Sequence, residues 1–138
     1  MFITFNRVRL DDTDAAGILF FANQFRFVHD ALDDFFDADG HSFNKMLFEY
    51  GFIFVIVRAE SDYLAPLTVG DNLEIHVMVE KIGTTSFIML YNIYKSDDHS
   101  LVGTSKTVHV CLDRVERTKL TIPDLYRSLL GKHTFAGQ

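Results

Sequence analysis

Apolar and polar residues alternate along several stretches in the second half of the chain, which is the pattern of half-buried β-strands. Strand-like stretches span residues 52–63, 72–81, 85–95 and 101–112, and turn residues separate them at 66–71, at Gly83 and at 96–100. The clearest stretch alternates Leu73, Ile75, Val77 and Val79 with Glu74, His76, Met78 and Glu80. Because consecutive strands joined by short turns pair side by side, we expect an antiparallel sheet.

A different period governs residues 22–37, where apolar side chains recur every three or four positions. They are Phe25, Val28, Leu32, Phe35 and Phe36, while polar residues, Gln24 among them, fall mostly elsewhere. This spacing predicts an amphipathic helix whose apolar stripe faces the core. Gly40 is suited to end that helix, and Ser42 to cap a second short helix within residues 41–49.

The ends of the chain add one element each. Residues 2–10 alternate well enough to predict a strand, which leads into a polar loop from Asp11 to Gly17. Pro123 is suited to the first position of a short terminal helix over residues 123–130. The order of strand, long helix and four strands is typical of an α+β fold in which one helix covers a curved sheet. Without repeats or linkers, residues 1–138 are expected to form a single domain.

Composition narrows the classes of partner and compartment. The formal net charge is −6 and the basic residues are scattered, so we expect no nucleic-acid partner. We find neither a leader-like start nor an apolar run near the ~18 residues of a membrane helix. We therefore expect a cytoplasmic location and no membrane partner. The single cysteine, Cys111, lies in an apolar-rich stretch and is interpreted as a small buried hydrophobe.

Three acidic residues, Asp11, Asp12 and Asp14, crowd the loop before the long helix. Acidic residues in such a place are usually solvated or cap the helix. An aspartate-nucleophile phosphotransferase loop would need alternating βα units, which the pattern lacks. A calcium loop starting at Asp37 would need Gly at its sixth and Glu at its twelfth position, where Ser42 and Phe48 stand. No metal site is therefore predicted.

The remaining interpretation of the loop is chemical. Gly17 allows a close approach of the backbone, and a free amide near Phe21, at the start of the helix, can stabilise an oxyanion. A carboxylate is a poor reagent for an ordinary amide, but a thioester carbonyl is more electrophilic and its thiolate leaves more easily. An aspartate in this loop is thus competent as a nucleophile or as a general base for water.

The loop also carries a family resemblance. Residues 12–23, Asp-Thr-Asp-Ala-Ala-Gly-Ile-Leu-Phe-Phe-Ala-Asn, resemble the D-x-D-x-x-G-x-x-aromatic-aromatic-x-N signature of 4-hydroxybenzoyl-CoA thioesterase-like hotdog proteins. Weaker matches follow in the same order. They lie at Val57-Arg58, at 62–66, at 70–75, at Thr85-Ser86-Phe87, at 110–113 and at Ile122-Pro123.

The resemblance implies a hotdog fold, in which an antiparallel sheet wraps around a long helix, and a homo-oligomer, either a dimer or a tetramer. It implies hydrolysis of a CoA thioester to the free acid and CoA, with no cofactor. By position, Asp14 matches the catalytic aspartate and Phe21 the residue whose backbone N–H polarises the thioester carbonyl. Gly17 matches a turn residue of the site, and Asn23 a residue that orders the loop or lines the pocket.

The resemblance extends to hydrolases of 1,4-dihydroxy-2-naphthoyl-CoA, of menaquinone and phylloquinone biosynthesis, through Asn23-Gln24-Phe25 and His29. It places His29, Arg58, Thr85 and Ser86 among the substrate-binding residues. A histidine at position 29 is more often packed and hydrogen-bonded than catalytic. Relatives often carry a basic residue before the Thr-Ser pair, and here Thr84 stands there. Alternative contacts for the CoA phosphates are Lys81, Arg58, Arg114, Arg117 and Lys119.

Two other functions compete with thioester hydrolysis. A hotdog hydratase would need a helix histidine with an acidic partner in a proline- and glycine-rich loop, and that loop is missing from the sequence. A non-catalytic module that binds acyl-CoA would use the same pocket, so it stays an open alternative. The acyl group itself depends on which Phe side chains point inward.

Overall fold

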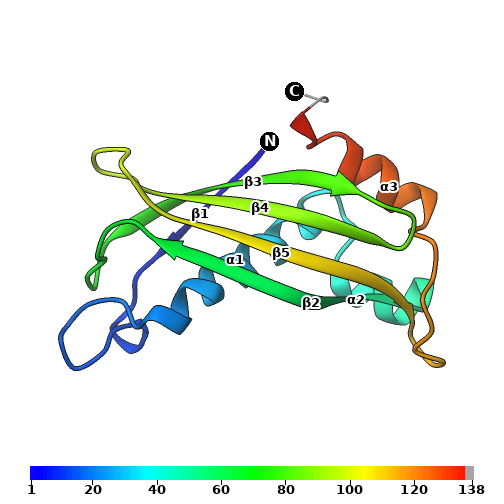
Figure 1. Cartoon of the computed structure of the whole chain (residues 1–138), viewed down its shortest axis with the longest axis horizontal. Coiled ribbons are helices and arrows are strands. Elements are labelled where there is room, and N and C mark those ends of the chain that lie inside the picture. The colour runs from blue at the N-terminus through cyan, green and yellow to red at the C-terminus, as the bar shows by residue number, and fades with distance from the viewer. Residues whose placement is uncertain (136–138) are drawn as a thin grey trace.

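A computed structural model describes residues 1–135, which form an antiparallel sheet curved around one long helix (Figure 1). The strands are β1 (Phe2–Arg7), β2 (Phe52–Tyr63), β3 (Asn72–Ile82), β4 (Ser86–Lys95) and β5 (Leu101–Asp113). Their order in the sheet is β1-β3-β4-β5-β2, so the two edges are β1 and β2. The long helix α1 (Gln24–Ala38) lies behind the sheet in this view.

Shorter helical segments complete the fold. Two 3₁₀ turns, η1 (Leu10–Asp12) and η2 (Phe21–Asn23), flank the acidic loop, and η2 runs directly into α1. The short helix α2 (Phe43–Lys45) continues as a π-helical turn, η3 (Met46–Tyr50). The terminal helix α3 (Asp124–Gly131) covers one end of the sheet (Figure 1). No helix of residues 1–135 combines the length and the apolar character needed to cross a membrane.

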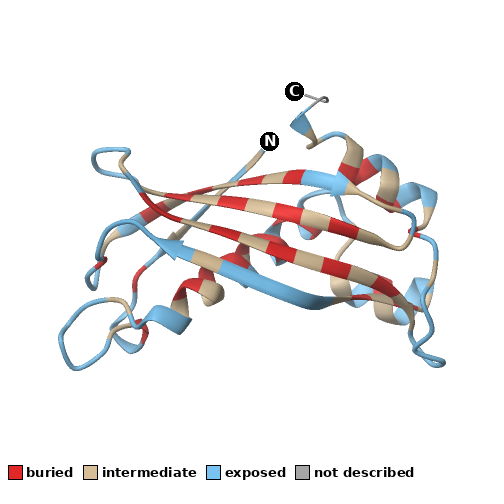
Figure 2. Ribbon diagram, in the orientation of Figure 1, coloured by how far each residue is buried: buried red, intermediate tan, exposed pale blue. Residues whose placement is uncertain are grey.

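The core lies between α1 and the inner face of the sheet. Along the central strands, buried residues alternate with half-buried ones (Figure 2). Phe36 of α1 is fully buried, and its ring packs against aromatic rings from four other segments, namely Phe43, Phe54, Phe87 and Tyr126. The apolar face of the strands, with a period of two residues, thus packs against the apolar face of the helix, with a period of three to four residues, as the sequence predicted.

The strand and helix predictions are confirmed to within one or two residues in most places. The first strand ends at Arg7 rather than Leu10 because Arg9 caps the η1 turn and bends the chain out of the sheet. Pro123 precedes α3 as its N-cap instead of opening it. Ser42 caps the short helix as expected, accepting a hydrogen bond from the Lys45 N–H at 3.3 Å.

The helix stripe needs one correction. Phe27 and Ala31 are buried along with the predicted core residues of α1, and Phe25 is only half-buried. Gln24, which was assigned to the polar side, is 1% exposed and belongs to the interior. Cys111 is buried as predicted, and burial raises the pKa of its thiol to about 11.

Candidate active site

The acidic loop folds back on itself as a small hairpin before α1. The Asp14 N–H donates to the Ile18 carbonyl at 2.9 Å, and the Phe20 N–H donates to the Asp12 carbonyl at 2.9 Å. Gly17 closes the tip with φ of +78°, a left-handed conformation that glycine adopts without strain. Gly17 therefore forms the turn at the tip of this hairpin.

The Asp14 side chain projects from this hairpin and is exposed in the single chain. Its Oδ1 accepts a hydrogen bond from the Ala16 N–H at 2.8 Å, and Gly17 N–H bonds the Asp14 carbonyl at 3.0 Å. The backbone thus fixes the direction of the carboxylate while leaving its other oxygen accessible. No cluster of three or more metal-ligating side chains forms at this loop within residues 1–135.

Asp12 has a different environment, since it is 2% exposed. Its carboxylate accepts two hydrogen bonds from Arg26, at 2.7 Å from Nε and 2.6 Å from Nη2, and a third from the Arg9 N–H at 2.8 Å. Burial acts to raise the pKa of Asp12, but these hydrogen bonds outweigh burial and hold the pKa below its usual value. Asp12 is therefore an ionised anchor that ties the loop to α1.

Phe21 begins the helical segment, as predicted. The first N–H groups of a helical segment have no intrahelical acceptor, so the Phe21 N–H is available to a ligand. The Phe21 carbonyl accepts a hydrogen bond from the Tyr63 hydroxyl at 2.6 Å, and Asn23 Nδ2 donates to the Asp12 carbonyl at 2.9 Å. Asn23 thus orders the loop, and the end of β2 fixes the turn that carries the free amide.

Gln24 ties the start of α1 to the sheet, a contact that the helical pattern of the sequence did not predict. Its Nε2 donates to Ser61 Oγ at 2.6 Å and to the Asp62 carbonyl at 3.1 Å. A Cβ on Gly103 would lie 2.7–2.9 Å from the Gln24 amide atoms, so any larger residue there would displace the Gln24 amide. A glycine inside a strand often marks a close approach of another group to the backbone. Gly103 is therefore the feature of the sequence that could have indicated the buried contact with Gln24.

Two apolar hollows adjoin the start of α1. The first, of about 320 Å³, lies between the acidic loop and the end of β2. Its lining includes Ile18, Phe21, Tyr63 and Pro66. The second is a groove of about 370 Å³ between α1 and β2. It is lined by Phe25, Arg26, Val28, His29, Leu32, Ile56, Ala59, Tyr91 and Thr107. His29 is exposed at this groove, where the resemblance placed it in substrate binding.

Buried polar groups lie behind the groove. The Tyr91 hydroxyl and Thr107 Oγ1 are 3.0 Å apart, and Thr107 Oγ1 lies 2.7 Å from His109 Nε2. His109 is fully buried, and its ring stacks on Phe87 with centroids 4.7 Å apart. Burial, with a smaller effect of His29, lowers the pKa of His109 to about 4. The wall behind the groove is therefore uncharged at neutral pH.

The other predicted binding residues lie away from Asp14. Thr85 and Ser86 lie at the turn between β3 and β4, at the end of the molecule opposite the acidic loop (Figure 1). Ser86 and Lys81 line a hollow of about 170 Å³ there. Arg127 of α3, which the sequence analysis did not single out, donates to the Gly83 carbonyl at 2.8 Å beside them.

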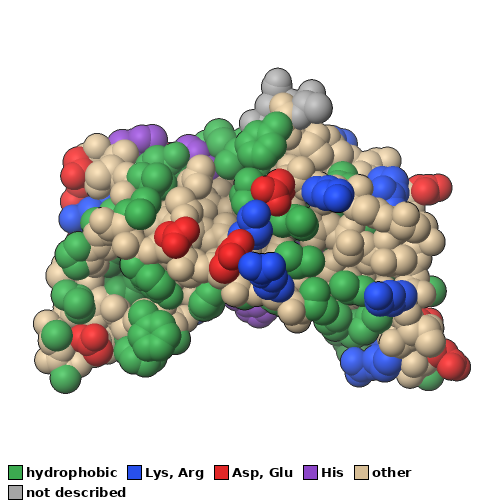
Figure 3. Space-filling model, in the orientation of Figure 1, with side chains coloured by type: hydrophobic (Ala, Val, Ile, Leu, Met, Phe, Trp, Pro, Cys, Tyr) green, Lys and Arg blue, Asp and Glu red, His purple; other side chains and the backbone are tan. Residues whose placement is uncertain are grey.

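Arg58 also lies outside the groove. It pairs with Val108 in the β2–β5 ladder and contacts Glu60 at 3.4 Å. Together with Lys106, which lies 3.2 Å from Glu80, these residues form a band of mixed charge across the middle of the sheet's outer face (Figure 3). Arg114, another phosphate candidate, bonds the Leu47 carbonyl at 2.8 Å. The single chain therefore brings Asp14, Phe21, Asn23 and His29 to one end, and leaves Arg58, Thr85 and Ser86 elsewhere.

This arrangement supplies three chemical parts. They are a directed carboxylate on Asp14, a free backbone N–H at Phe21, and apolar hollows along the first turns of α1. A carboxylate and an amide that can bind an oxyanion, carried on one loop, suit attack on an activated carbonyl.

Comparison with known proteins agrees with this chemistry. Residues 8–130 match the sequence profile of the Thioesterase-like superfamily. The 1,4-dihydroxy-2-naphthoyl-CoA hydrolase of Nostoc punctiforme is 36% identical over 125 residues, which cover 90% of this chain and 83% of that protein. The protein of the same name from Gloeothece citriformis is 32% identical over 133 residues, covering 96% and 93%.

A solved structure gives the same result. The crystal structure of a 1,4-dihydroxy-2-naphthoyl-CoA thioesterase from Synechocystis superposes with a TM-score of 0.87 at 26% sequence identity, covering 94% of each chain. The similarity therefore extends over the sheet, the long helix and the loop that precedes it.

Proposed function

Because this chain belongs to the Thioesterase-like superfamily, we propose that it hydrolyses an aromatic CoA thioester, with 1,4-dihydroxy-2-naphthoyl-CoA as the leading substrate. The resemblance seen in the motifs and the hotdog fold expected from it are both confirmed. The chain is accordingly a CoA-thioester hydrolase, releasing free acid and CoA. The named substrate would place it in menaquinone or phylloquinone biosynthesis.

The observation that carries the proposal is that the Asp14 carboxylate and the free Phe21 N–H lie on the same anchored loop. The Ala16 N–H directs the Asp14 carboxylate, and the Tyr63 hydroxyl holds the turn whose first amide is free. In the proposed reaction Asp14 either attacks the thioester carbonyl, forming an anhydride that water then hydrolyses to the free acid, or takes a proton from the water that attacks the carbonyl directly. The Phe21 N–H donates to the carbonyl oxygen as negative charge develops there, and the CoA thiolate departs.

The groove between α1 and β2 is the proposed site for the aromatic acyl group. Its lining is almost entirely apolar, with the Phe25 ring and Leu32 on the helix side and Ile56 on the strand side. His29 is the polar residue at its exposed margin that we propose contacts a ring hydroxyl of the substrate. Pockets of this kind derive affinity from apolar contact and orientation from a few polar groups.

We further propose that two copies of the chain pair through β2. This strand lies at one edge of the sheet, and Ile56 and Val57 in its middle are 45% and 59% exposed (Figure 2). An exposed apolar edge strand offers unpaired backbone groups to another chain. A second copy paired antiparallel would close the open side of the groove and place its own opposite end beside Asp14.

This pairing gives Thr85 and Ser86 a role. In one chain they lie at the end far from Asp14 (Figure 1), but a two-fold axis across β2 would bring the second copy's Thr85 and Ser86 toward the acidic loop. Lys81, which shares the hollow with Ser86, is the proposed contact for the CoA phosphates. The binding of the nucleotide would then come from one copy and the carboxylate from the other.

The test is release of free thiol from naphthoyl, benzoyl and aliphatic CoA esters by the purified chain and by Asp14→Asn. We expect the naphthoyl ester to give the highest kcat/KM, and Asn at position 14 to lower kcat by ~10³-fold because it can neither attack nor accept a proton. Asp11→Asn is the matched control, since Asp11 is exposed on the same loop. Full turnover by Asp14→Asn would refute the mechanism.

The same panel separates catalysis from simple binding. If the wild-type chain cleaves none of the esters but binds them with micromolar affinity in calorimetry, the chain is an acyl-CoA-binding module. If aliphatic esters are cleaved faster than aromatic ones, the enzyme class stands and the aromatic substrate is wrong.

A further inference from the structure

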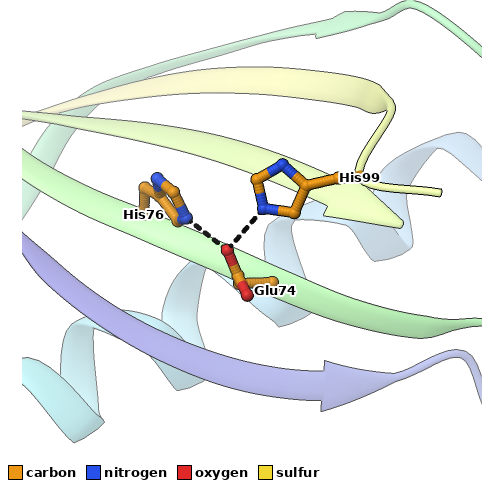
Figure 4. Close-up of side chains that lie close together, drawn as sticks. All are labelled: Glu74, His76 and His99. Carbon is orange, nitrogen blue, oxygen red and sulfur yellow. Dashed lines mark hydrogen bonds and ion pairs between the residues drawn. The ribbon is translucent and has the colours of Figure 1, made fainter. Parts of the chain in front are cut away.

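Two histidines and a glutamate converge on one face of the sheet, beside the turn between β4 and β5 (Figure 4). Glu74 and His76 are two residues apart on β3, so their side chains share one face. The residues between and beside them, Leu73, Ile75 and Val77, are fully buried against the core. Glu74 and His76 therefore face outward, and His99 approaches from the turn between β4 and β5.

The ligand atoms of the three side chains are already close together. His76 Nε2 lies 2.6 Å from Glu74 Oε2, and His99 Nε2 lies 2.9 Å from the same oxygen. All three atoms lie within 4.8 Å of one another. Adjacent ligands of a tetrahedral Zn²⁺ with bonds of ~2.0–2.1 Å stand roughly 3.3 Å apart. Shifts of less than about 1 Å in each contact with Glu74 would therefore accommodate an ion in place of the hydrogen-bonding protons.

The surrounding structure holds both imidazoles in place. Tyr94 pairs with Glu74 in the β3–β4 ladder, and its ring contacts both histidine rings. The His99 ring stacks on it with centroids 4.9 Å apart and planes at 13°, and the His76 ring lies 4.7 Å away. The two imidazoles thus both pack against one aromatic ring.

The backbone of His99 adds to this organisation. His99 has φ of +58°, in the left-handed region that residues other than glycine seldom adopt. Its N–H bonds the Lys95 carbonyl at 2.9 Å, and the Lys95 N–H bonds the Ser100 carbonyl at 2.9 Å. These bonds hold the turn closed with the imidazole directed at Glu74. The side chains of His76 and Glu74 are only 13% and 21% exposed, whereas that of His99 is 59% exposed, so water reaches the ligand set from the His99 side.

We propose that Glu74, His76 and His99 form a binding site for a divalent transition-metal ion, with Zn²⁺ as the best match. Two imidazole nitrogens and one carboxylate oxygen are ligands that Zn²⁺ favours, and a fourth position remains for water. No local sequence motif indicates this site, because His99 lies 25 residues from Glu74 along the chain. The ion would tie the β4–β5 turn to β3, independently of the proposed hydrolase function.

The test begins with the full chain treated with a chelator and dialysed. Titration with ZnCl₂ at pH 7.5 in a calorimeter should give one ion per chain, and Zn²⁺ should raise Tm, because a ligand that binds the folded state stabilises it. Co²⁺ added in place of zinc should give the visible absorption of a four-coordinate nitrogen and oxygen site. No heat and no Tm shift with up to millimolar zinc would overturn the proposal.

Variants assign the binding to these side chains. His99→Asn removes the imidazole Nε2 but tolerates the left-handed backbone, so the turn should keep its shape. We expect His99→Asn, His76→Gln and Glu74→Gln each to weaken zinc binding by at least ~10-fold. Glu80→Gln is the control, because Glu80 is an exposed glutamate on the same strand and face. Unchanged zinc affinity in folded His99→Asn would mean that the ion binds elsewhere.

Discussion

Asp12 and Asp14 are two residues apart, yet they differ in what surrounds them. Asp12 is buried and bound by Arg26 and the Arg9 N–H, whereas Asp14 is exposed and bound by the Ala16 N–H. A carboxylate that is fully engaged cannot serve as a nucleophile without breaking its ion pair. Asp12 holds the loop in place, and the exposed carboxylate of Asp14 is left available for reaction.

This division predicts the effect of Asp12→Asn. The amide cannot accept both charged hydrogen bonds from Arg26, so we expect a loss of about 2 kcal/mol in the free energy of unfolding, with Arg26 one-third exposed. Thioesterase kcat should fall as well, because the loop that carries Asp14 loses its anchor. Urea unfolding and kinetics of the same preparations measure both quantities. Asp11→Asn should change neither, and equal effects of the two variants would argue against the anchor role.

The lowered pKa of His109 predicts how the free energy of unfolding depends on pH. Its pKa is about 4 in the folded chain and about 6.5 when unfolded, so between these values only the unfolded state binds the proton. Its contribution is complete above pH 6.5 and is lost as pH falls toward 4, by about 3 kcal/mol in all. Urea unfolding from pH 7.5 to 4.5 should show this slope. His109→Gln should unfold with a slope about 1.4 kcal/mol per pH unit shallower, and parallel curves would contradict the prediction.

At the scale of elements, the contact between α1 and the sheet depends on Gln24 and Gly103. A methyl group on Gly103 would lie within 2.9 Å of the Gln24 amide and displace it from Ser61 and Asp62. We therefore expect Gly103→Ala to cost about 1–3 kcal/mol and to lower kcat/KM, since α1 follows the Phe21 turn directly. Gly131→Ala is the control, because nothing lies within 4 Å of its added methyl group. Thermal unfolding and thiol release would show a selective effect, and equal outcomes would count against it.

The central strands were predictable because buried and half-buried positions alternate along them, and apolar and polar residues follow the same alternation. β3 alternates buried Leu73, Ile75 and Val77 with outward-facing residues, and its predicted start at Asn72 is confirmed. The α1 stripe was predictable for the same reason, with a different period. Patterns of this kind show which side of a strand or helix is apolar. They therefore predict the position of each strand and helix better than they predict the contacts between them.

The contacts that build the candidate site were not predictable in the same way. Gln24 reads as a surface residue, and its burial depends on Gly103 in β5, which lies far along the chain. The role of Asp12 depends on Arg26, one turn into the helix, and the metal-ligand cluster depends on the β4–β5 turn. Asp14, Gly17 and Phe21 were assigned through a family motif, and periodicity alone would have left them in a solvated acidic turn.

At the scale of the whole molecule, one chain separates the two halves of the proposed site. The acidic loop lies at one end of the sheet, and Thr85 and Ser86 at the other (Figure 1). β2 runs between these ends along an edge whose middle is exposed. Pairing of two such edges about a two-fold axis would give two equivalent sites, each with parts from both copies.

Mixing two inactive variants tests this geometry. Asp14→Asn removes the carboxylate, and Ser86→Glu places a negative charge where the CoA phosphates are proposed to lie, so each variant alone should be inactive. If the site is shared, mixed dimers contain one intact site, and an equimolar mixture should recover roughly a quarter of wild-type thiol release after subunit exchange. Recovery should disappear when both chains also carry Val57→Lys, which puts charge in the middle of the β2 edge. It should persist with the control Val115→Lys, which puts the same charge on an exposed valine outside β2, in the turn after β5.

Each outcome of the mixing experiment has a separate meaning. Sedimentation of the wild-type chain should show a dimer or a larger oligomer at micromolar concentration, and Val57→Lys should shift it toward monomer. An oligomer without recovered activity would mean that Asp14 and Ser86 act within one chain or in different sites. Full activity of Ser86→Glu alone would remove Ser86 from the substrate contacts, while leaving the Asp14 mechanism to be judged on its own variant. The division of the site between copies thus stands on complementation rather than on the oligomeric state.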